Sequence, residues 1–210
     1  MRTVLVLACV VASVAPAADL VHFSFLPGER VLLDAHNCYP YGGMWFDRID
    51  RALASGMPLS IEIDLGWYVD PATGEGRLVV SHGDHMDGRE PTLREYFFDR
   101  VRPVVEQALG EGPAPGWPLI TLNINDIRAH TPDAWRAAWD LLREHEAWLT
   151  TAVKAAPPDP VAPLDVKPVL VLTSGRRAEV EAFYDSVPIG GKLLAFGSGS
   201  DGRPAPNFRR

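Results

Sequence analysis

Short apolar, β-branched runs alternate along this chain with segments whose apolar residues recur at helical spacing. Runs of four to eight such residues, bounded by polar or turn-forming residues, are typical of buried strands. We expect six strands, at residues 30–33, 58–65, 77–80, 119–124, 168–172 and 192–196.

Segments between these runs place apolar side chains on one helical stripe. The stripes are Trp45, Ile49 and Leu53; Trp135, Ala138, Trp139 and Leu142; and Val180, Phe183 and Tyr184. Helix start signals agree, because Thr92 and Glu95 match a capping box and Thr131 precedes a proline suited to the first helical position. We expect Trp45 to belong to the apolar core.

Alternation of strand and helix predicts a parallel sheet with crossover helices. The sheet is either an open doubly wound one or a (β/α)8 barrel of the TIM type. No glycine-rich phosphate fingerprint follows the first strand, which weakens the dinucleotide-binding version of the open sheet. A barrel needs ~250 residues, so we expect an incomplete one with about six strands in a single domain over residues 18–210.

The amino terminus has the pattern of a secretory signal peptide. Met1 and Arg2 precede an apolar run over residues 3–14, and Ala15-Pro16-Ala17 is a small-x-small cleavage pattern. We expect residues 1–17 to be removed and the protein to be secreted or extracytoplasmic, which means periplasmic in a Gram-negative bacterium. A retained anchor is the alternative. After cleavage Cys38 is the only cysteine, so no intrachain disulfide forms.

The charge balance bears on the partners. A formal net charge of −7 and a pI near 5.3 argue against nucleic acid as a partner, and against an anionic membrane recognised by bulk charge. An anionic substrate therefore requires local cations or a metal.

Two carboxylates share one face of the second predicted strand. Glu62 and Asp64 alternate with Ile61, Ile63 and Leu65, so the acidic side chains point away from the helices. Two like charges on an inner face are costly without a cation. Carboxylate oxygens suit Mg²⁺ or Ca²⁺; a salt-bridged arginine is the other solution.

Two histidines follow neighbouring strands. His36 and Asn37 come directly after the first predicted strand, and His82 comes directly after the third. Because catalytic groups gather at the carboxyl ends of parallel strands, we expect three successive strands to bring these residues and the two carboxylates to one rim.

These motifs, over about residues 31–128, resemble the opening of the phospholipase C-like phosphodiesterases. The His36-Asn37 pair is closer to the phosphatidylinositol phospholipase C version than to the glycerophosphodiesterase version. Residues 92–96 resemble a branch similar to the fungal mitochondrial-inheritance proteins. The resemblance implies a barrel, a divalent cation, and a metal-dependent phosphoric diester hydrolase that acts on a glycerophospholipid or a glycerophosphodiester.

Roles follow from this resemblance residue by residue. His36 and His82 are the expected general base and acid. The expected metal ligands are Asn37, Glu62, Asp64 and Asp126, the last of which requires a bulge at Asn125 to bring it to the inner face. Arg128 and Trp67 are the expected substrate-binding residues. Transient contact with a membrane surface fits a lipid substrate.

Two other functions fit the same pattern. One is cleavage of the phospholipase D type on the same barrel. The other is a secreted, non-catalytic barrel that binds a lipid or a sugar.

Overall fold

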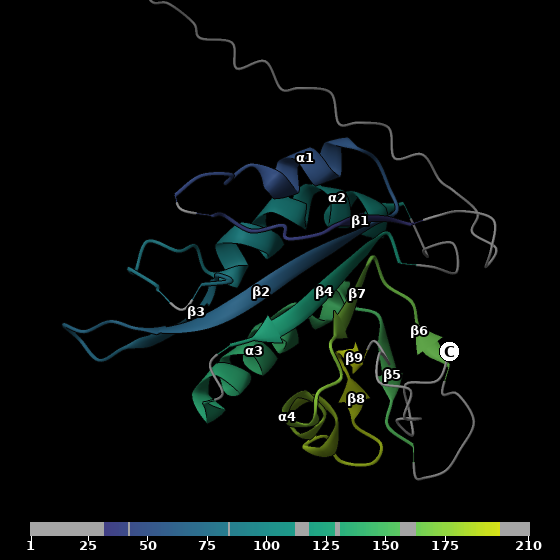
Figure 1. Cartoon of the computed structure of the whole chain (residues 1–210). Helices are drawn as coiled ribbons and strands as arrows, with labels where there is room; N and C mark the ends of the chain where they lie inside the picture. The colour runs from purple at the N-terminus through teal and green to yellow at the C-terminus, as the bar shows by residue number, and fades with distance from the viewer. Residues whose placement is uncertain are drawn as a thin grey trace, which may run out of the picture.

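Five parallel strands form most of the central sheet, and their order across it follows their order along the chain (Figure 1). The computed structural model describes residues 32–41, 43–83, 85–111, 118–128, 131–155 and 163–197. The five strands, in spatial order, are β1 (Leu33–Ala35), β2 (Leu59–Val69), β4 (Ile120–Ile127), β7 (Val169–Thr173) and β9 (Phe196–Gly197). Each neighbouring pair is parallel.

Helical segments connect these strands. They are α1 (Arg48–Ala54), η1 (Arg94–Phe98) running into α2 (Asp99–Gly110), α3 (Pro132–Glu144), η2 (Glu146–Trp148), and α4 (Arg177–Val180) running into η3 (Glu181–Asp185). Because the strand order never reverses, right-handed crossovers carry the connections over one face of the sheet. Ile49 of α1, Val101 of α2 and Ala138 of α3 accordingly join Ile61 and Ile63 in one apolar core.

Both predicted helix starts are confirmed. The Thr92 hydroxyl accepts the backbone N–H of Glu95 at 3.2 Å, and the Glu95 carboxylate accepts the backbone N–H of Thr92 at 2.9 Å. This reciprocal pair is the capping box expected from the sequence. Thr131 caps α3 by accepting the Ala134 N–H at 3.4 Å, and Pro132 occupies the first helical position.

The third predicted strand departs from the expected parallel arrangement. β3 (Gly76–Val80) pairs with the distal half of β2 as an antiparallel hairpin, with Leu65 opposite Val80 and Val69 opposite Gly76. Only a short turn separates the two strands, which is long enough for a hairpin and too short for a crossover helix. The expectation that three successive parallel strands carry the site residues was therefore wrong.

A second, antiparallel sheet of three short strands lies beside the first. Its order is β6 (Leu164–Asp165), β5 (Thr151–Val153) and β8 (Lys192–Leu193). The predicted strand at residues 192–196 is thus divided, since β8 joins this sheet and β9 joins the central one. Strands β5 and β6 were missed, because runs of two or three residues are too short to show a period.

The prediction of an α/β protein with a mostly parallel sheet is confirmed, whereas the (β/α)8 barrel stays a prediction. The strand predicted at residues 30–33 corresponds to β1, which begins at Leu33 and ends at Ala35. Residues 30 and 31 lie outside the described part of the chain, as does the predicted signal peptide. Among the described residues, no helix has the length and apolar character needed to cross a membrane.

Candidate functional site

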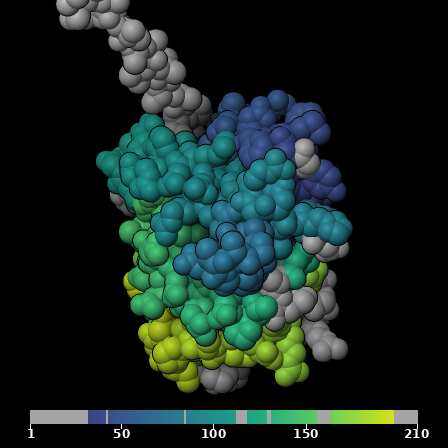
Figure 2. Space-filling view, turned by 90° about the vertical axis from the view of Figure 1, so that its left-hand side faces the viewer, coloured from purple at the N-terminus to yellow at the C-terminus, as the bar shows by residue number. Residues whose placement is uncertain are grey.

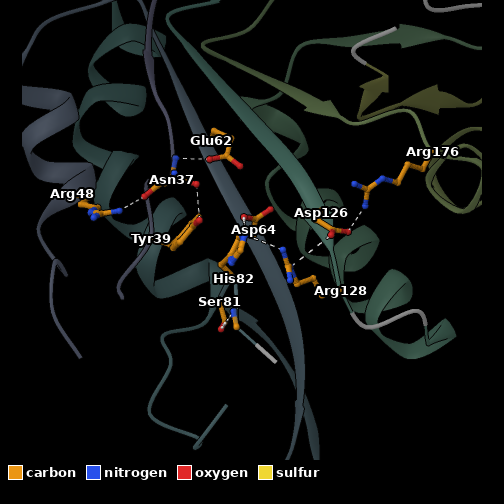
Figure 3. Close-up of polar contacts among 11 residues, drawn as sticks. Asn37, Tyr39, Arg48, Glu62, Asp64, Ser81, His82, Asp126, Arg128 and Arg176 are labelled. Atoms are coloured by element: carbon orange, nitrogen blue, oxygen red, sulfur yellow. Dashed lines mark hydrogen bonds and ion pairs between the residues drawn. The ribbon is translucent and has the colours of Figure 1, made fainter. Parts of the chain in front are cut away.

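The carboxyl ends of β1 and β3 meet head to head along one edge of β2. β1 runs parallel to residues 59–61, and β3 runs antiparallel along residues 65–69. The residues that follow each strand hydrogen-bond to the part of β2 that lies between the two strand ends. Cys38 N donates to the backbone carbonyl of Glu62 at 2.8 Å, and Ser81 N donates to the backbone carbonyl of Asp64 at 3.1 Å. This arrangement brings the segments after both strands to the two carboxylates (Figure 3).

Glu62 is buried in this gap with one carboxylate oxygen unpartnered. Its Oε2 accepts the backbone N–H of Asn37 at 2.5 Å, whereas its Oε1 is buried without a hydrogen-bond partner. Burial raises the pKa of Glu62; the Asn37 N–H opposes this rise and the charge of Asp64 adds to it.

Asp64 repeats this pattern two residues along. It is buried, its Oδ1 has no hydrogen-bond partner, and its Oδ2 lies 3.9 Å from Nε2 of His82. Burial raises the pKa of Asp64, although the nearby His82 and Arg128 lower it. Two buried carboxylates, two residues apart on one strand face, therefore each have an oxygen without a hydrogen-bond partner, an arrangement that a cation would compensate.

Asn37 is held in a left-handed backbone conformation, with φ of 54°. Asparagine tolerates this region better than most residues. Three contacts fix it: its N–H to Glu62, its carbonyl to Arg48 Nη1 at 2.5 Å, and its Oδ1 to the Tyr39 hydroxyl at 2.6 Å. Asn37 thus connects the turn after β1 to the carboxylate strand, and its amide oxygen lies within this network.

His82 lies at the centre of the polar cluster. Its ring stacks on Tyr39 with centroids 5.7 Å apart, and its Nε2 lies 2.9 Å from Nη2 of Arg128. A guanidinium offers only donors, so this contact is a hydrogen bond when Nε2 is the unprotonated ring nitrogen and accepts. Burial raises the pKa of Tyr39 to about 12, and the charges of Asp64 and Glu62 add to the rise.

The bulge at Asn125 that Asp126 requires to reach the inner face is present. Ile63 is in register with Ile124 and Asp64 with Asp126, so the extra residue between Ile124 and Asp126 is Asn125, which is exposed. The bulge places Asp126 beside Asp64 on the neighbouring strand, as expected.

Two arginines hold Asp126. Its Oδ1 accepts Arg176 Nη1 at 2.7 Å, and its Oδ2 lies 3.7 Å from Arg128 Nε. Arg176, which follows β7, was missed by the sequence reasoning. Its position just beyond a parallel strand was the signal that pointed to it.

Trp67 does not join the cluster. Strand alternation puts it on the face of Ile63 and Leu65, opposite the carboxylates, and its partly buried indole packs against the core and over Gly76. The structure therefore does not bring Trp67 to the carboxylates, and its role in substrate binding stays a prediction. The carboxylate face carries Gly66 at the position beyond Asp64, and Met86 covers that glycine.

Two further expectations have mixed outcomes. His36 is exposed in the turn after β1, and its charge is close enough to Glu62 to lower the pKa of that carboxyl. Trp45 was expected in the core, but it precedes α1 with φ of 66° and is exposed. The helical stripe predicted from Trp45, Ile49 and Leu53 therefore began one turn too early, because α1 starts at Arg48.

Glu62 and Asp64 fit a hard divalent cation by their chemistry, because each has a buried carboxylate oxygen without a hydrogen-bond partner on the same strand face. The fit is limited to this pair and the nearby amide of Asn37. Within the described ranges, no group of three or more His, Cys, Asp or Glu side chains is arranged to hold a metal ion.

Comparison with known proteins adds no relative. No family model, no curated protein and no solved structure matches this chain.

Proposed function

We propose that this protein is a metal-dependent phosphoric diester hydrolase acting on a glycerophospholipid or glycerophosphodiester. The observation that carries the proposal is the meeting of the turns after β1 and β3 at two buried carboxylates with unpaired oxygens. Histidine, arginine and paired carboxylates around one point are the groups that phosphoryl transfer uses.

An incomplete (β/α)8 barrel is the architecture we propose for this site. Its support is the strand order, since five parallel strands whose spatial order follows their order along the chain are expected of a singly wound sheet and not of a doubly wound one. In such an arc the inner face is the one that carries Glu62, Asp64 and Asp126.

The two histidines would divide the proton transfers. His36 would take the proton from the attacking hydroxyl, and His82 would protonate the leaving oxygen. Asp64, whose Oδ2 lies 3.9 Å from Nε2 of His82, favours the imidazolium form that this second role needs. His36 is exposed in the turn after β1, and its charge lowers the pKa of Glu62.

A Mg²⁺ or Ca²⁺ ion bound by Glu62 and Asp64 would neutralise developing negative charge on the phosphate oxygens. Asn37 would orient Glu62 through its N–H, and Arg128 would contact the phosphate directly. Asp126 is the weakest member of the proposed ligand set, because its carboxylate already accepts from Arg176.

This engagement of Asp126 favours a second candidate, a non-catalytic barrel that recognises a phosphorylated lipid or sugar through Arg128 and Arg176. Such a protein would bind the ligand without turning it over.

For either function we propose export from the cytoplasm with removal of residues 1–17. D-type cleavage is separated from C-type cleavage by the product, which is a phosphatidate in the first case and a phosphorylated headgroup in the second.

The test measures hydrolysis of glycerophosphocholine and of a chromogenic phosphodiester in the presence of Mg²⁺ or Ca²⁺. We expect His36→Ala and His82→Ala each to lower kcat by ~100-fold or more, since general acid–base groups contribute on that scale. The matched control is His85→Ala, because His85 is an exposed histidine three residues beyond His82. Full activity in both site variants would exclude the hydrolase.

A further inference from the structure

A pocket of about 650 Å³ lies between α3, η3 and β8. Figure 2 shows the green region that includes α3 beside the yellow region that includes η3 and β8. None of the residues that line this pocket belongs to the candidate site described above. Its volume is within the range of ~300–1,000 Å³ that is typical of small-molecule sites. We call it the tryptophan pocket, and its lining includes Trp135, Trp139, Arg143, Val187 and Leu194.

Two tryptophans form one wall of the pocket. Trp135 and Trp139 lie one turn apart on α3, and both are only half-buried. Their rings contact Phe183 of η3, with centroids 5.8 Å and 6.2 Å apart. The sequence pattern assigned both tryptophans to a core stripe, but the contact with Phe183 leaves part of each indole at the pocket. The pocket therefore offers two aromatic surfaces whose positions are fixed by packing.

The wall that follows η3 is held in place by contacts within the fold. Lys154 Nζ donates to the backbone carbonyls of Tyr184 and Val187 at 2.8 Å and 2.7 Å. Gly191 N donates to the Pro188 carbonyl at 2.9 Å, and a Cβ at Gly191 would lie 2.9 Å from that carbonyl oxygen. Only glycine fits this turn without a shift of the backbone. The pocket is therefore preformed, as small-molecule sites usually are.

The charges that line the pocket leave one cation uncompensated. Lys192 is paired with Glu146, and Arg136 is paired with Asp133 at 2.9 Å. Arg143 lies on the same helical stripe as the two tryptophans, and within the described part of the chain no carboxylate pairs with its side chain. The whole chain carries a net charge of −7, so this excess is local. The pocket therefore favours an anion.

We propose that the tryptophan pocket binds a small aromatic carboxylate. The ring of the ligand packs against the two indoles and the buried apolar side chains of Val187 and Leu194, and its carboxylate pairs with Arg143. The planar guanidinium matches a carboxylate with two parallel hydrogen bonds. One uncompensated cation matches one negative charge, which favours a carboxylate over a doubly charged phosphate. This proposal is independent of the hydrolase activity proposed above.

The experiment is an NMR titration of the full chain with 2-naphthoate, followed on the indole N–H signals of its six tryptophans. We expect the signals of Trp135 and Trp139, assigned with Trp→Phe variants, to shift and to saturate with a Kd of about 1 mM or below. Two companion probes separate charge from ring. The 2-naphthylmethylammonium ion has the same ring and the opposite charge, and acetate has the charge without the ring; both should bind more weakly.

Arg143→Gln should weaken 2-naphthoate binding about fivefold or more, because it removes the charge at an exposed position. The matched control is Arg51→Gln, which removes an exposed arginine from α1 and should bind like the unmodified protein. Trp139→Leu should weaken binding of both naphthyl probes, with the exposed Trp45→Leu as its control. Urea unfolding establishes that each variant folds.

Four outcomes would each overturn the tryptophan pocket as a binding site. They are no saturable shift up to about 10 mM 2-naphthoate, equal shifts at all six indoles, equal binding of the two naphthyl probes, and unchanged binding by Arg143→Gln. No step of the experiment measures hydrolysis of a phosphodiester. Loss of the proposed hydrolase activity would therefore leave this inference standing, and failure of this inference would leave the hydrolase standing.

Discussion

At the scale of single residues, burial does most to define the site. Glu62 and Asp64 are 2% and 1% exposed, so each unpaired oxygen has lost its water without gaining a donor. The sequence placed both carboxylates on one strand face, because alternation is a local property. It gave no measure of their burial, which depends on the turn around Asn37 and on the chain after β3.

Cys38 offers a test of how tightly this turn is packed. It is buried, and burial raises the pKa of its thiol to about 12. Because the thiolate is the reactive form, a Cys9→Ser protein should react with a disulfide reagent at pH 8 at least ~100-fold more slowly than free cysteine. Labelling over a urea series should accelerate only in the unfolding transition; rapid labelling of the native protein would mean that the turn opens.

At the scale of elements, the β2–β3 hairpin is the feature that delivers His82. A parallel third strand would also have brought a histidine to the rim. The prediction that His82 lies near the two carboxylates was therefore correct, although it assumed a parallel β3 and the strand is antiparallel to β2. The physical reason is that β1 and β3 occupy one edge of β2 from opposite ends. Strand direction depends on the length of the connection, and residues 70–75 allow only a turn.

Gly76→Ala tests the importance of the hairpin. A Cβ at this position would lie 2.2 Å from Cζ2 of Trp67, so the indole or the strand must shift. We expect a loss of about 1–3 kcal/mol in the free energy of unfolding, and lower activity because β3 leads into His82. Urea denaturation gives the stability.

The matched control is Gly110→Ala in α2, where an added Cβ meets no atom within 4 Å. This change should leave stability unchanged or raise it slightly, because alanine is the better helix former. If Gly76→Ala is as stable as the control, the Trp67 contact does not constrain the hairpin.

At the scale of the whole molecule, the site should make stability depend on pH and on cations. Burial raises the pKa of Glu62, so the folded state binds this proton more tightly than the unfolded state does. Its contribution is therefore most favourable below the unfolded pKa of ~4.3, and stability is lost as the pH rises through the higher folded value. Above that value, the folded protein carries a buried charge that a cation would compensate.

Glu62→Gln should consequently be more stable than the unmodified protein at pH 7 without metal. We expect a gain of about 1–3 kcal/mol, since the amide oxygen still accepts the Asn37 N–H and the uncompensated charge is gone. The difference should shrink toward pH 4. Urea denaturation over this pH range measures it, with Glu75→Gln as the exposed control.

Mg²⁺ or Ca²⁺ should stabilise the unmodified protein and the Glu75→Gln control, but not Glu62→Gln, because the ion binds the folded state through that carboxylate. Equal stability of Glu62→Gln and the unmodified protein at pH 7 would show that the charge is already compensated. Equal stabilisation of all three by the cation would show that the ion binds elsewhere.

Local chemistry in the sequence was sufficient for several features. The alternation around Glu62 and Asp64, the capping box at Thr92 and the cap at Thr131 were all predicted, because each depends on residues within a few positions of one another. The bulge at Asn125 was only a condition for placing Asp126 on the inner face, and the structure has it. Strand–helix alternation determined the α/β class with a mostly parallel sheet.

Only the tertiary structure decided the rest. How distant segments meet determines the direction of β3, the exposure of Trp45, and the ion pair between Arg176 and Asp126, which lie fifty residues apart. Sequence periodicity records which face of an element is apolar, but it does not record which elements cover that face. The site is therefore readable in the sequence as a set of residue types, and its burial, pairing and access arise only when β1, β2 and β3 come together.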